Sequence, residues 1–299
     1  MHSTETYPIQ EFLNYLTFQK RYSKHTIISY QNDLCDFFYF IFLEYQIKEV
    51  KEITAPLIRT WLANLKEKKA SSKTINRKIS TLKSFFKYQL RINNISINPV
   101  STISSLKVSR RLPSFIAEND ISVLLKNDFF PPTFEGKTDY LIFEILYQTG
   151  IRRNELINLK DNDVDKNSSV IKVLGKGNKE RLIPINNQLV QLIEEYISEK
   201  KRVFSDLPQN LLVNKKGRPV YAKYVYNIVK LNLSKVSTNE RKSPHILRHT
   251  FATHLTNNGA QINAIKELLG HSSLAATQMY THNTIEKLKE AHKLSHPKG

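Results

Sequence analysis

The chain has 299 residues, of which 40% are hydrophobic, with one cysteine and a formal net charge of +18 at pH 7. This length suits one large domain or two ordinary ones, and the hydrophobic content excludes a chain that is disordered throughout. The single cysteine excludes an intramolecular disulfide framework and a cysteine-rich metal site.

The composition also bears on the compartment. The longest uninterrupted apolar run, residues 37–43, is far shorter than the roughly 20 residues that a membrane span needs. The first residues lack the basic and apolar regions of a secretory signal peptide. We therefore expect a cytoplasmic protein with no membrane partner.

Positive charge is concentrated in one part of the chain. Residues 1–50 hold 4 basic and 6 acidic residues, whereas residues 51–111 hold 14 basic and 2 acidic residues. A focused excess of Lys and Arg is typical of a protein that follows the phosphates of a nucleic acid. The alternative is a basic protein without such a partner, and the uneven distribution argues against it.

The first hundred residues predict helices. Ser23 is a candidate N-cap, and apolar residues follow it at helical spacing. A second helix is expected from Ala55 and Pro56, and a third after Ser71. The third helix carries an apolar stripe made of Ile75, Ile79, Leu82, Phe86 and Leu90.

The other face of this third helix is basic. Lys73, Arg77, Lys87 and Arg91 share it with two serines, and almost no acidic residue interrupts it. A solvated charged face is the ordinary explanation for such a pattern, but the shortage of acids favours contact with the DNA backbone. We predict that these four residues bind DNA.

A connection between two domains is expected next. Residues 98–115, NPVSTISSLKVSRRLPSF, are punctuated by Ser and Pro and lack helical periodicity. The pair Arg110 and Arg111 in this stretch suits a strap across DNA, so we include both among the predicted DNA-binding residues.

The second half of the chain predicts helices around a small sheet. Residues 140–159 form a strong helical pattern that Gly150 interrupts, and residues 169–185 alternate as two strands around a turn at 175–178. Further helices are expected over 189–197, over 223–233, and from 245 onward with an end at Gly270. The predicted fold class is mainly α with a small antiparallel β-sheet, in two domains.

The second half offers arginines rather than metal ligands. It has no Walker-type loop and no His-Glu-x-x-His pair, and its acids are scattered, so neither a metal nor a cofactor is expected. Phosphoryl transfer without a metal needs fixed positive charge, a nucleophile and a proton donor. Arginine suits the first need, and Arg152 follows a glycine break while Arg248 lies one helical turn from His245.

Four segments then decide the interpretation: TGIRRNELINL, GKGNKERLIPI, HILRHTFATHL and LLGHSSLAATQMYTH. In this order and at these separations they resemble the signature of the tyrosine recombinases, the lambda-integrase family, and above all its bacterial Xer subfamily. The resemblance covers the second half tightly and the first half more loosely, and no signature position departs from the pattern.

The resemblance implies a role for each matching position. Arg152 and Arg248 would clamp the scissile phosphate, and Lys176 at the hairpin tip would protonate the departing 5′ oxygen. Tyr280 would attack phosphorus and become a 3′-phosphotyrosine. A free tyrosine has a pKa near 10, and cationic neighbours would lower that value.

Three further positions match. His245 and His271 would hydrogen-bond the phosphate and assist proton transfer at the nucleophile, since a neutral imidazole can take up the proton of a tyrosine. Glu155 matches an acidic position that would brace the site. We expect no residue of this chain to bind a metal ion.

The resemblance also implies the domain organisation. It predicts a helical SAM-like core-binding domain that clamps DNA over residues 1–108, a linker over 109–114 and a catalytic domain over 115–299. The tail after the nucleophile has a modest apolar stripe of Ile285, Leu288, Ala291 and His292 or Leu294. We expect it to contact a neighbouring protomer; a short helix that covers its own domain is the alternative.

The expected function is site-specific recombination of the Xer type, through a Holliday junction, for resolving chromosome dimers. The implied partners are double-stranded DNA with a roughly palindromic site, a homo- or heterotetramer of recombinases, and a septal DNA translocase as activator. An integrase or transposase of a mobile element shares the chemistry and is the main alternative. A type IB topoisomerase-like enzyme and a DNA-binding accessory protein without catalysis are further alternatives.

Overall fold

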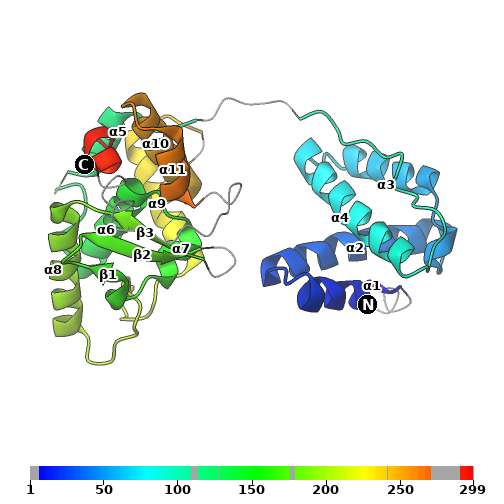
Figure 1. Ribbon diagram of the computed structural model, residues 1–299, viewed down its shortest axis with the longest axis horizontal. Coiled ribbons are helices and arrows are strands. Elements are labelled where there is room, and N and C mark those ends of the chain that lie inside the picture. Colours follow the sequence, from blue (N-terminus) through cyan, green and yellow to red (C-terminus); the bar gives the residue numbers. More distant parts are fainter. Residues whose placement is uncertain are drawn as a thin grey trace. The chain divides into compact units, whose positions relative to one another are not determined.

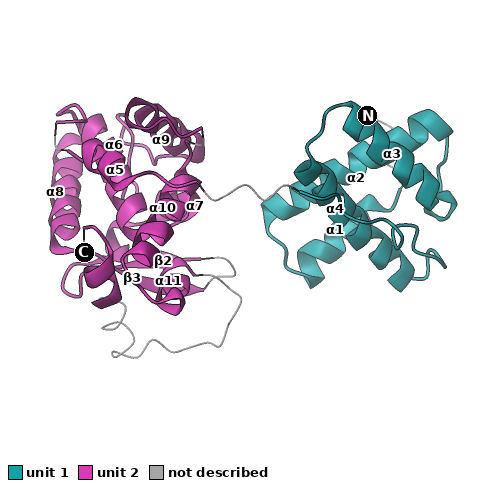
Figure 2. Cartoon of the chain, turned by 90° about the horizontal axis from the view of Figure 1, so that it is seen from above, with its two compact units in different colours: residues 1–111 teal, residues 112–299 magenta. Residues whose placement is uncertain are grey.

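The computed structural model describes residues 7–108, 114–126, 128–175, 179–240, 242–270 and 290–298. The chain divides into two compact units, Met1–Arg111 and Leu112–Gly299, which Figure 1 and Figure 2 show in ribbon form. In the residues so described, every helix is too short or too polar to cross a membrane.

The described part of the first unit is built from helices. Their bounds are α1 (Ile9–Asn14), the π-helical turn η1 (Tyr15–Gln19), α2 (Lys24–Tyr45), the 3-10 turn η2 (Val50–Glu52), α3 (Ala55–Glu67) and α4 (Ser72–Arg91). The side chains of Ser23 and Ser71 accept hydrogen bonds from the backbone amides of Thr26 and Thr74, so both act as N-caps. The three helices expected from the sequence are confirmed, whereas α1 is too short to give a periodic signal.

Aromatic side chains fill the core of this unit. Phe37, Phe38, Trp61, Phe85 and Phe86 are fully buried, and the rings of Phe37 and Trp61 meet edge to face at 4.9 Å. The predicted apolar stripe of α4 is buried except at its last member, Leu90, which lies near the helix end and is exposed. The stripe therefore holds α4 against α2 and α3.

The first part of the expected connecting segment belongs to the first unit. Val100 and Ile103 are buried in its core, and the Asn76 side chain binds the backbone of Leu106 twice, accepting from its N–H at 2.8 Å and donating to its carbonyl at 2.9 Å. Residues 98–106 are thus not a linker, although they lack helical periodicity. Two buried apolar side chains, together with the Asn76 side chain, dock this segment without regular structure.

The second unit packs helices around a small sheet. Its elements are α5 (Glu118–Leu124), α6 (Phe134–Thr149), α7 (Arg153–Asn158), the 3-10 turn η3 (Asp161–Asp163), β1 (Val164–Asp165), β2 (Val170–Leu174), β3 (Glu180–Pro184), α8 (Asn187–Val203), α9 (Ala222–Val236), α10 (Pro244–Asn257) and α11 (Ile262–Leu269). Helix α6 is central, because it contacts α7, α8, α9 and α10 and its residues 141–149 are all buried.

The predicted hairpin is confirmed. Strands β2 and β3 pair antiparallel, from Val170 opposite Pro184 to Leu174 opposite Glu180. The two-residue strand β1 adds to the other edge of β2, which gives the order β1-β2-β3. The mainly helical fold with a small antiparallel sheet is therefore as the sequence predicts.

Two glycines end helices that lead into the signature segments. Gly150 (φ +60°) ends α6, and Gly270 (φ +63°) ends α11, both in the left-handed conformation that glycine adopts without strain. At Gly150 a Cβ would lie 2.5 Å from the Phe251 ring, so no larger residue fits. The predicted break at Gly150 is confirmed, although α6 begins at Phe134, after the Thr133 cap, rather than at residue 140.

The described part of the C-terminal tail packs on its own unit. Nε2 of His292 donates to the Gln148 carbonyl at 2.8 Å, and Nε2 of His296 donates to the Tyr147 carbonyl at 3.2 Å. These carbonyls belong to the last turn of α6, where no intrahelical donor is available. His292 is buried and Leu294 is 74% exposed, so His292 is the inward member of the expected stripe. Docking of the tail on a neighbouring protomer stays a prediction.

Candidate active site

Arg152 lies where α6 has ended and α7 begins. It is the N-cap residue of α7, in an extended conformation with φ −75° and ψ 150°. Glu155, three residues on, accepts hydrogen bonds from the Arg152 backbone amide and from its Nη1, both at 2.8 Å. The Arg152 side chain is partly exposed, whereas Glu155 is buried, so the carboxylate holds the guanidinium from the protein side.

A second arginine binds the same carboxylate and was not among the predicted site residues. Arg181 on β3 donates from Nη1 to Oε1 of Glu155 at 3.0 Å and from Nη2 to Oε2 at 2.7 Å. Its Nε donates to the Leu268 carbonyl at 2.9 Å. The sequence held a signal for it, because strand alternation places Arg181 on the same face as Ile183, and an arginine on a buried strand face requires an acidic partner.

Arg248 on α10 connects two other turns. Its Nη1 donates to the Gly150 carbonyl at 2.7 Å, and its Nη2 donates to the Leu269 carbonyl at 2.5 Å. The side chain is only 9% exposed, and in the part of the chain that the structure describes it makes no ion pair. Burial, followed by the charges of Arg152 and Arg181, lowers the pKa of Arg248 to about 10, which leaves it charged at neutral pH.

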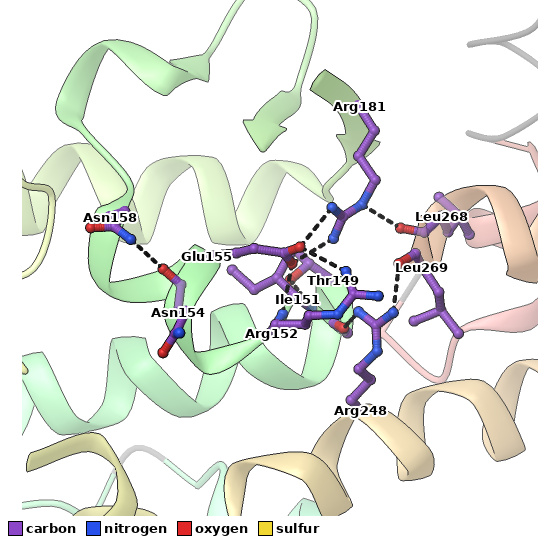
Figure 3. A network of polar contacts seen from close by, with 11 residues as sticks. Thr149, Ile151, Arg152, Asn154, Glu155, Asn158, Arg181, Arg248, Leu268 and Leu269 are labelled. Carbon is purple, nitrogen blue, oxygen red and sulfur yellow. Dashed lines mark hydrogen bonds and ion pairs between the residues drawn. The ribbon is translucent and has the colours of Figure 1, made fainter. Parts of the chain in front are cut away.

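Figure 3 shows how these contacts converge. Arg152, Arg181 and Arg248 reach toward one region from α7, β3 and α10, and Glu155 lies between the first two. The described residues of this cluster thus carry an excess of positive charge in a largely buried setting. Such an excess favours an anion with several oxygens, as a phosphodiester has.

The carboxylate in this cluster is ionised. Burial by itself raises the pKa of Glu155, but the hydrogen bonds and charge of Arg181, and then those of Arg152, outweigh it and bring the pKa below its ordinary value. Glu155 therefore carries a negative charge at neutral pH and binds both guanidinium groups as an anion.

His245 lies at the start of α10, one turn before Arg248. Desolvation by the surrounding protein, and then the positive charges of Arg153, His249 and Arg248, lower the pKa of His245 below its ordinary value. At neutral pH the imidazole is therefore uncharged, which is the form that accepts a proton.

Several tyrosines of the second unit are poor nucleophiles. Tyr224 donates to the Asp139 carboxylate at 2.8 Å, and Tyr140 donates to Glu144 at 2.8 Å. Burial, followed by these acids, raises the pKa of both phenols, and burial raises the pKa of Tyr196 to about 12. Each of these hydroxyl groups holds its proton more tightly than a free tyrosine does.

Five predicted site residues lie outside the described residues: Lys176, His271, Tyr280, Arg110 and Arg111. The described residues Gly175 and Gly270 directly precede Lys176 and His271. Among the residues that the structure does describe, no group of three or more His, Cys, Asp or Glu side chains could hold a metal ion.

The basic face of α4 is exposed, but two of its members have partners within their own unit. Arg77 makes an ion pair with the buried Asp33 of α2 and donates to Ser29 at 2.8 Å. Arg91 stacks over the ring of Tyr15 at 4.2 Å. Lys73 and Lys87 also lie on the exposed side of the helix.

Sequence comparison gives matches to one family over both units. Residues 115–287 match the phage integrase family, and residues 9–93 match the N-terminal SAM-like domain of phage integrases. A protein named tyrosine recombinase XerC from Listeria welshimeri is 38% identical over 97% of both chains. Another of that name, from Thermodesulfovibrio yellowstonii, is 36% identical over 99% of this chain and 98% of its own.

Two solved structures share the fold. The XerH site-specific recombinase bound to its palindromic difH substrate in a post-cleavage complex aligns with a TM-score of 0.72 at 24% identity, over 90% of this chain and 79% of that one. The Tn1549 transposon integrase in complex with a circular intermediate DNA aligns with a TM-score of 0.71 at 20% identity, over 94% and 98%.

Proposed function

This chain belongs to the phage integrase family, the tyrosine recombinases, and from that premise we propose that it is a Xer-type site-specific recombinase that resolves chromosome dimers. Members of this family are enzymes that cleave and rejoin DNA. The main observation behind this proposal is that Arg248 binds the carbonyl of Gly150, two residues before Arg152, so that both arginines lie at one turn. The chain also aligns with XerC proteins along almost its whole length.

In the proposed reaction the Tyr280 hydroxyl oxygen attacks the scissile phosphorus. His245 takes up the phenol proton, His271 hydrogen-bonds the phosphate, and the bond from phosphorus to the 5′ oxygen breaks as Lys176 donates a proton to that oxygen. The products are a 3′-phosphotyrosine and a 5′-hydroxyl. Because the new bond is again a phosphate ester, attack by a 5′-hydroxyl of the partner strand rejoins DNA without ATP.

The arginines supply the charge that this reaction needs. Arg248 uses two of its N–H groups on backbone carbonyls, and its other N–H groups have no hydrogen-bond partner among the residues that the structure describes, so we assign them to non-bridging phosphate oxygens. Arg152 keeps a partly exposed guanidinium that Glu155 binds through one side-chain hydrogen bond. The lowered pKa of His245 supports its part, since only a neutral imidazole can accept the proton.

The DNA substrate we propose is a roughly palindromic double-stranded site. Two protomers would bind its half-sites, and two such sites would pair in a homo- or heterotetramer that exchanges strands through a Holliday junction. A septal DNA translocase is the proposed activator. The exposed basic face of α4 supports a contact with the DNA backbone in the first unit.

The proposal is tested on a selected DNA site. Duplexes that the unmodified chain retains from a randomised pool should converge on a palindrome of about 28–30 bp, with half-sites about one helical turn apart. A nick beside the cleavage point then traps the covalent adduct, which a denaturing gel detects, with EDTA present throughout. The unmodified chain should form the adduct, and Tyr280→Phe should bind the site without forming it.

The matched control is Tyr226→Phe, which removes the hydroxyl of an exposed tyrosine on α9 and should leave the adduct intact. An adduct with Tyr280→Phe contradicts the proposed nucleophile, and loss of all adduct in EDTA that magnesium restores contradicts the metal-free chemistry.

A mobile-element integrase is the second candidate, and the shared fold of the Tn1549 transposon integrase keeps it open. The genomic position of the selected site separates the two roles. A site with no adjoining element supports dimer resolution, whereas copies at both ends of an element support integration. Relaxation of a supercoiled plasmid without the site would instead favour a topoisomerase-like activity.

A further inference from the structure

One buried arginine of the second unit has no part in the proposed reaction. All three nitrogens of the Arg181 guanidinium bind protein oxygens: two bind the Glu155 carboxylate, and Nε binds the Leu268 carbonyl. The residue is only 4% exposed. Its donors are thus directed at the protein, which distinguishes Arg181 from Arg152 and its partly exposed side chain.

Two glycines make room for this guanidinium. A Cβ on Gly175 would lie 3.4 Å from Nη1 of Arg181, and a Cβ on Gly270 would lie 3.3 Å from its Nε and 3.1 Å from its Cδ. Arg181 therefore lies against the base of the hairpin and the end of α11, and it bonds to the first turn of α7. These segments come from three separate signature motifs.

The Glu155 carboxylate needs a second cationic partner if the Arg152 guanidinium is to bind a phosphate. A buried carboxylate with Arg152 as its only partner would compete with the substrate for the same guanidinium. Arg181 instead binds both carboxylate oxygens, and Arg152 keeps one side-chain hydrogen bond to Oε1 at 2.8 Å. The carboxylate is thereby fixed in place, while most of the Arg152 side-chain donors have no partner among the described residues.

We propose that Arg181 is a positioning residue for strand cleavage: it holds the Glu155 carboxylate in the orientation from which Glu155 directs Arg152 toward the scissile phosphate. This proposal rests on the proposed function, because it takes Arg152 to be a phosphate ligand. Arg181 itself does not touch the substrate.

The arrangement has a consequence for pH. The charged groups of the described residues that face Glu155 are Arg152 at the start of α7, Arg181 on β3 and Arg248 on α10. Burial raises the pKa of Glu155, and Arg181 is the strongest opposing influence. Without Arg181 the carboxylate takes up a proton at a higher pH, and a protonated Glu155 binds Arg152 more weakly. Cleavage should then decline as the pH falls.

The test measures the rate of covalent adduct formation on the selected nicked duplex, between about pH 5 and pH 8, where an exposed carboxylate stays ionised. The variants are Arg181→Met, Arg181→Lys, Glu155→Gln and the double variant E155Q/R181M. The control is Lys166→Met, which removes an exposed lysine that pairs with Glu194 at 3.3 Å on the surface of the same unit. DNA binding and thermal unfolding are measured for each protein.

Arg181→Met should slow adduct formation about 100-fold at neutral pH, the size of effect expected when a catalytic group is displaced by about 1 Å. It should slow further as the pH falls, and Arg181→Lys should recover part of the rate. With Glu155→Gln already present, adding Arg181→Met should cost little and add no acid decline, because no titrating carboxylate remains.

Equal slowing by Arg181→Met with and without the Glu155 carboxylate overturns the proposal, as does an unaltered pH profile. If Arg181→Met fails to fold, E155Q and E155Q/R181M can still be compared, since neither variant buries an unpaired carboxylate. Similar rates of adduct formation in these two variants support the proposal, and a large difference overturns it. Absence of an adduct with the unmodified chain would instead overturn the proposed function and this inference together.

Discussion

The guanidinium of Arg77 on α4 makes an ion pair with the carboxylate of Asp33 on α2, which is buried. Thr81 donates to the same carboxylate at 2.9 Å, and Lys78 pairs with it at 3.2 Å. Arg77 therefore helps to hold α4 against α2, even though it lies on the face predicted to bind DNA. A charge reversal at Arg77 would disturb folding and DNA binding at once.

Lys73 and Lys87 are the better residues for testing that face. The double variant Lys73→Glu/Lys87→Glu should weaken DNA binding, and the slope of log affinity against log salt should fall by about 0.9 for each phosphate that a lysine no longer neutralises. Gel-shift titrations at several salt concentrations give the slope. An unchanged slope would mean that the two lysines are only solvated surface charges.

Arg77→Met should act mainly on stability. It removes one hydrogen bond to a buried charge, so the first unit should lose about 1–3 kcal/mol of unfolding free energy. Trp61 is the one tryptophan of the chain and lies in that unit's core, so its fluorescence follows this transition alone. A variant as stable as the unmodified chain would show that Lys78 and Thr81 satisfy Asp33 by themselves.

Lys176 can be tested through the leaving group. Lys176→Ala should slow cleavage of ordinary DNA by about 10²–10⁴-fold, the usual contribution of a positioned proton donor. With sulfur in place of the bridging 5′ oxygen, the leaving thiolate needs no proton, and the variant should cleave nearly as fast as the unmodified chain. Equal defects on both substrates would show that Lys176 does not act as the acid.

The tail histidines should make the second unit sensitive to acid. Burial, and then the neighbouring His292, lowers the pKa of His296 to about 3. An unfolded histidine takes up a proton below about pH 6.5, whereas the buried one does not until about pH 3. The stabilising effect of the neutral ring is therefore full above pH 6.5 and is lost as the pH falls toward 3, by about 2 kcal/mol between pH 7 and pH 5.

His296→Gln should flatten that dependence, because a glutamine amide can donate to the Tyr147 carbonyl without titrating. Circular dichroism during chemical denaturation follows the helices of both units, and Trp61 fluorescence follows the first unit alone, so the transition that only circular dichroism detects is that of the second unit. His25→Gln, at an exposed position of the first unit, is the matched histidine control. The same acid sensitivity in His296→Gln would assign the effect to other groups.

The tail also carries the predicted contact with a neighbouring protomer. Because His292 and His296 bind carbonyls of α6, deleting the tail would remove that packing as well. Ile285→Gln/Leu288→Gln is the sharper change, since it alters the apolar stripe and keeps both histidines. Binding to a single half-site should be normal and cooperative binding to the full site should be lost, in paired gel-shift titrations. Retained cooperativity would leave the tail with an intramolecular role only.

Features that depend on neighbouring residues could be predicted from the amino-acid sequence. Ser23 and Ser71 cap their helices, alternation over residues 169–185 specifies the hairpin, and Gly150 and Gly270 end helices because the chain there turns left-handed. The four signature segments also indicated the family, and the family implied the expected roles of Arg152 and Arg248. Short apolar segments such as α1 and α5 gave no such signal, since one or two turns contain too few residues for a period.

Contacts between residues that are distant in the chain could be found only in the folded structure. Nothing near Arg181 in the chain specifies that its partner is Glu155, 26 residues away, or that Asp33 binds Arg77 across 44 residues. The same holds for Val100 and Ile103, which dock on the first unit, and for His292, which turns inward in place of Leu294. A buried charge needs a partner, and tertiary packing determines which residue is close enough to serve. That packing depends on the shapes of whole helix and sheet faces, which a local sequence pattern does not specify.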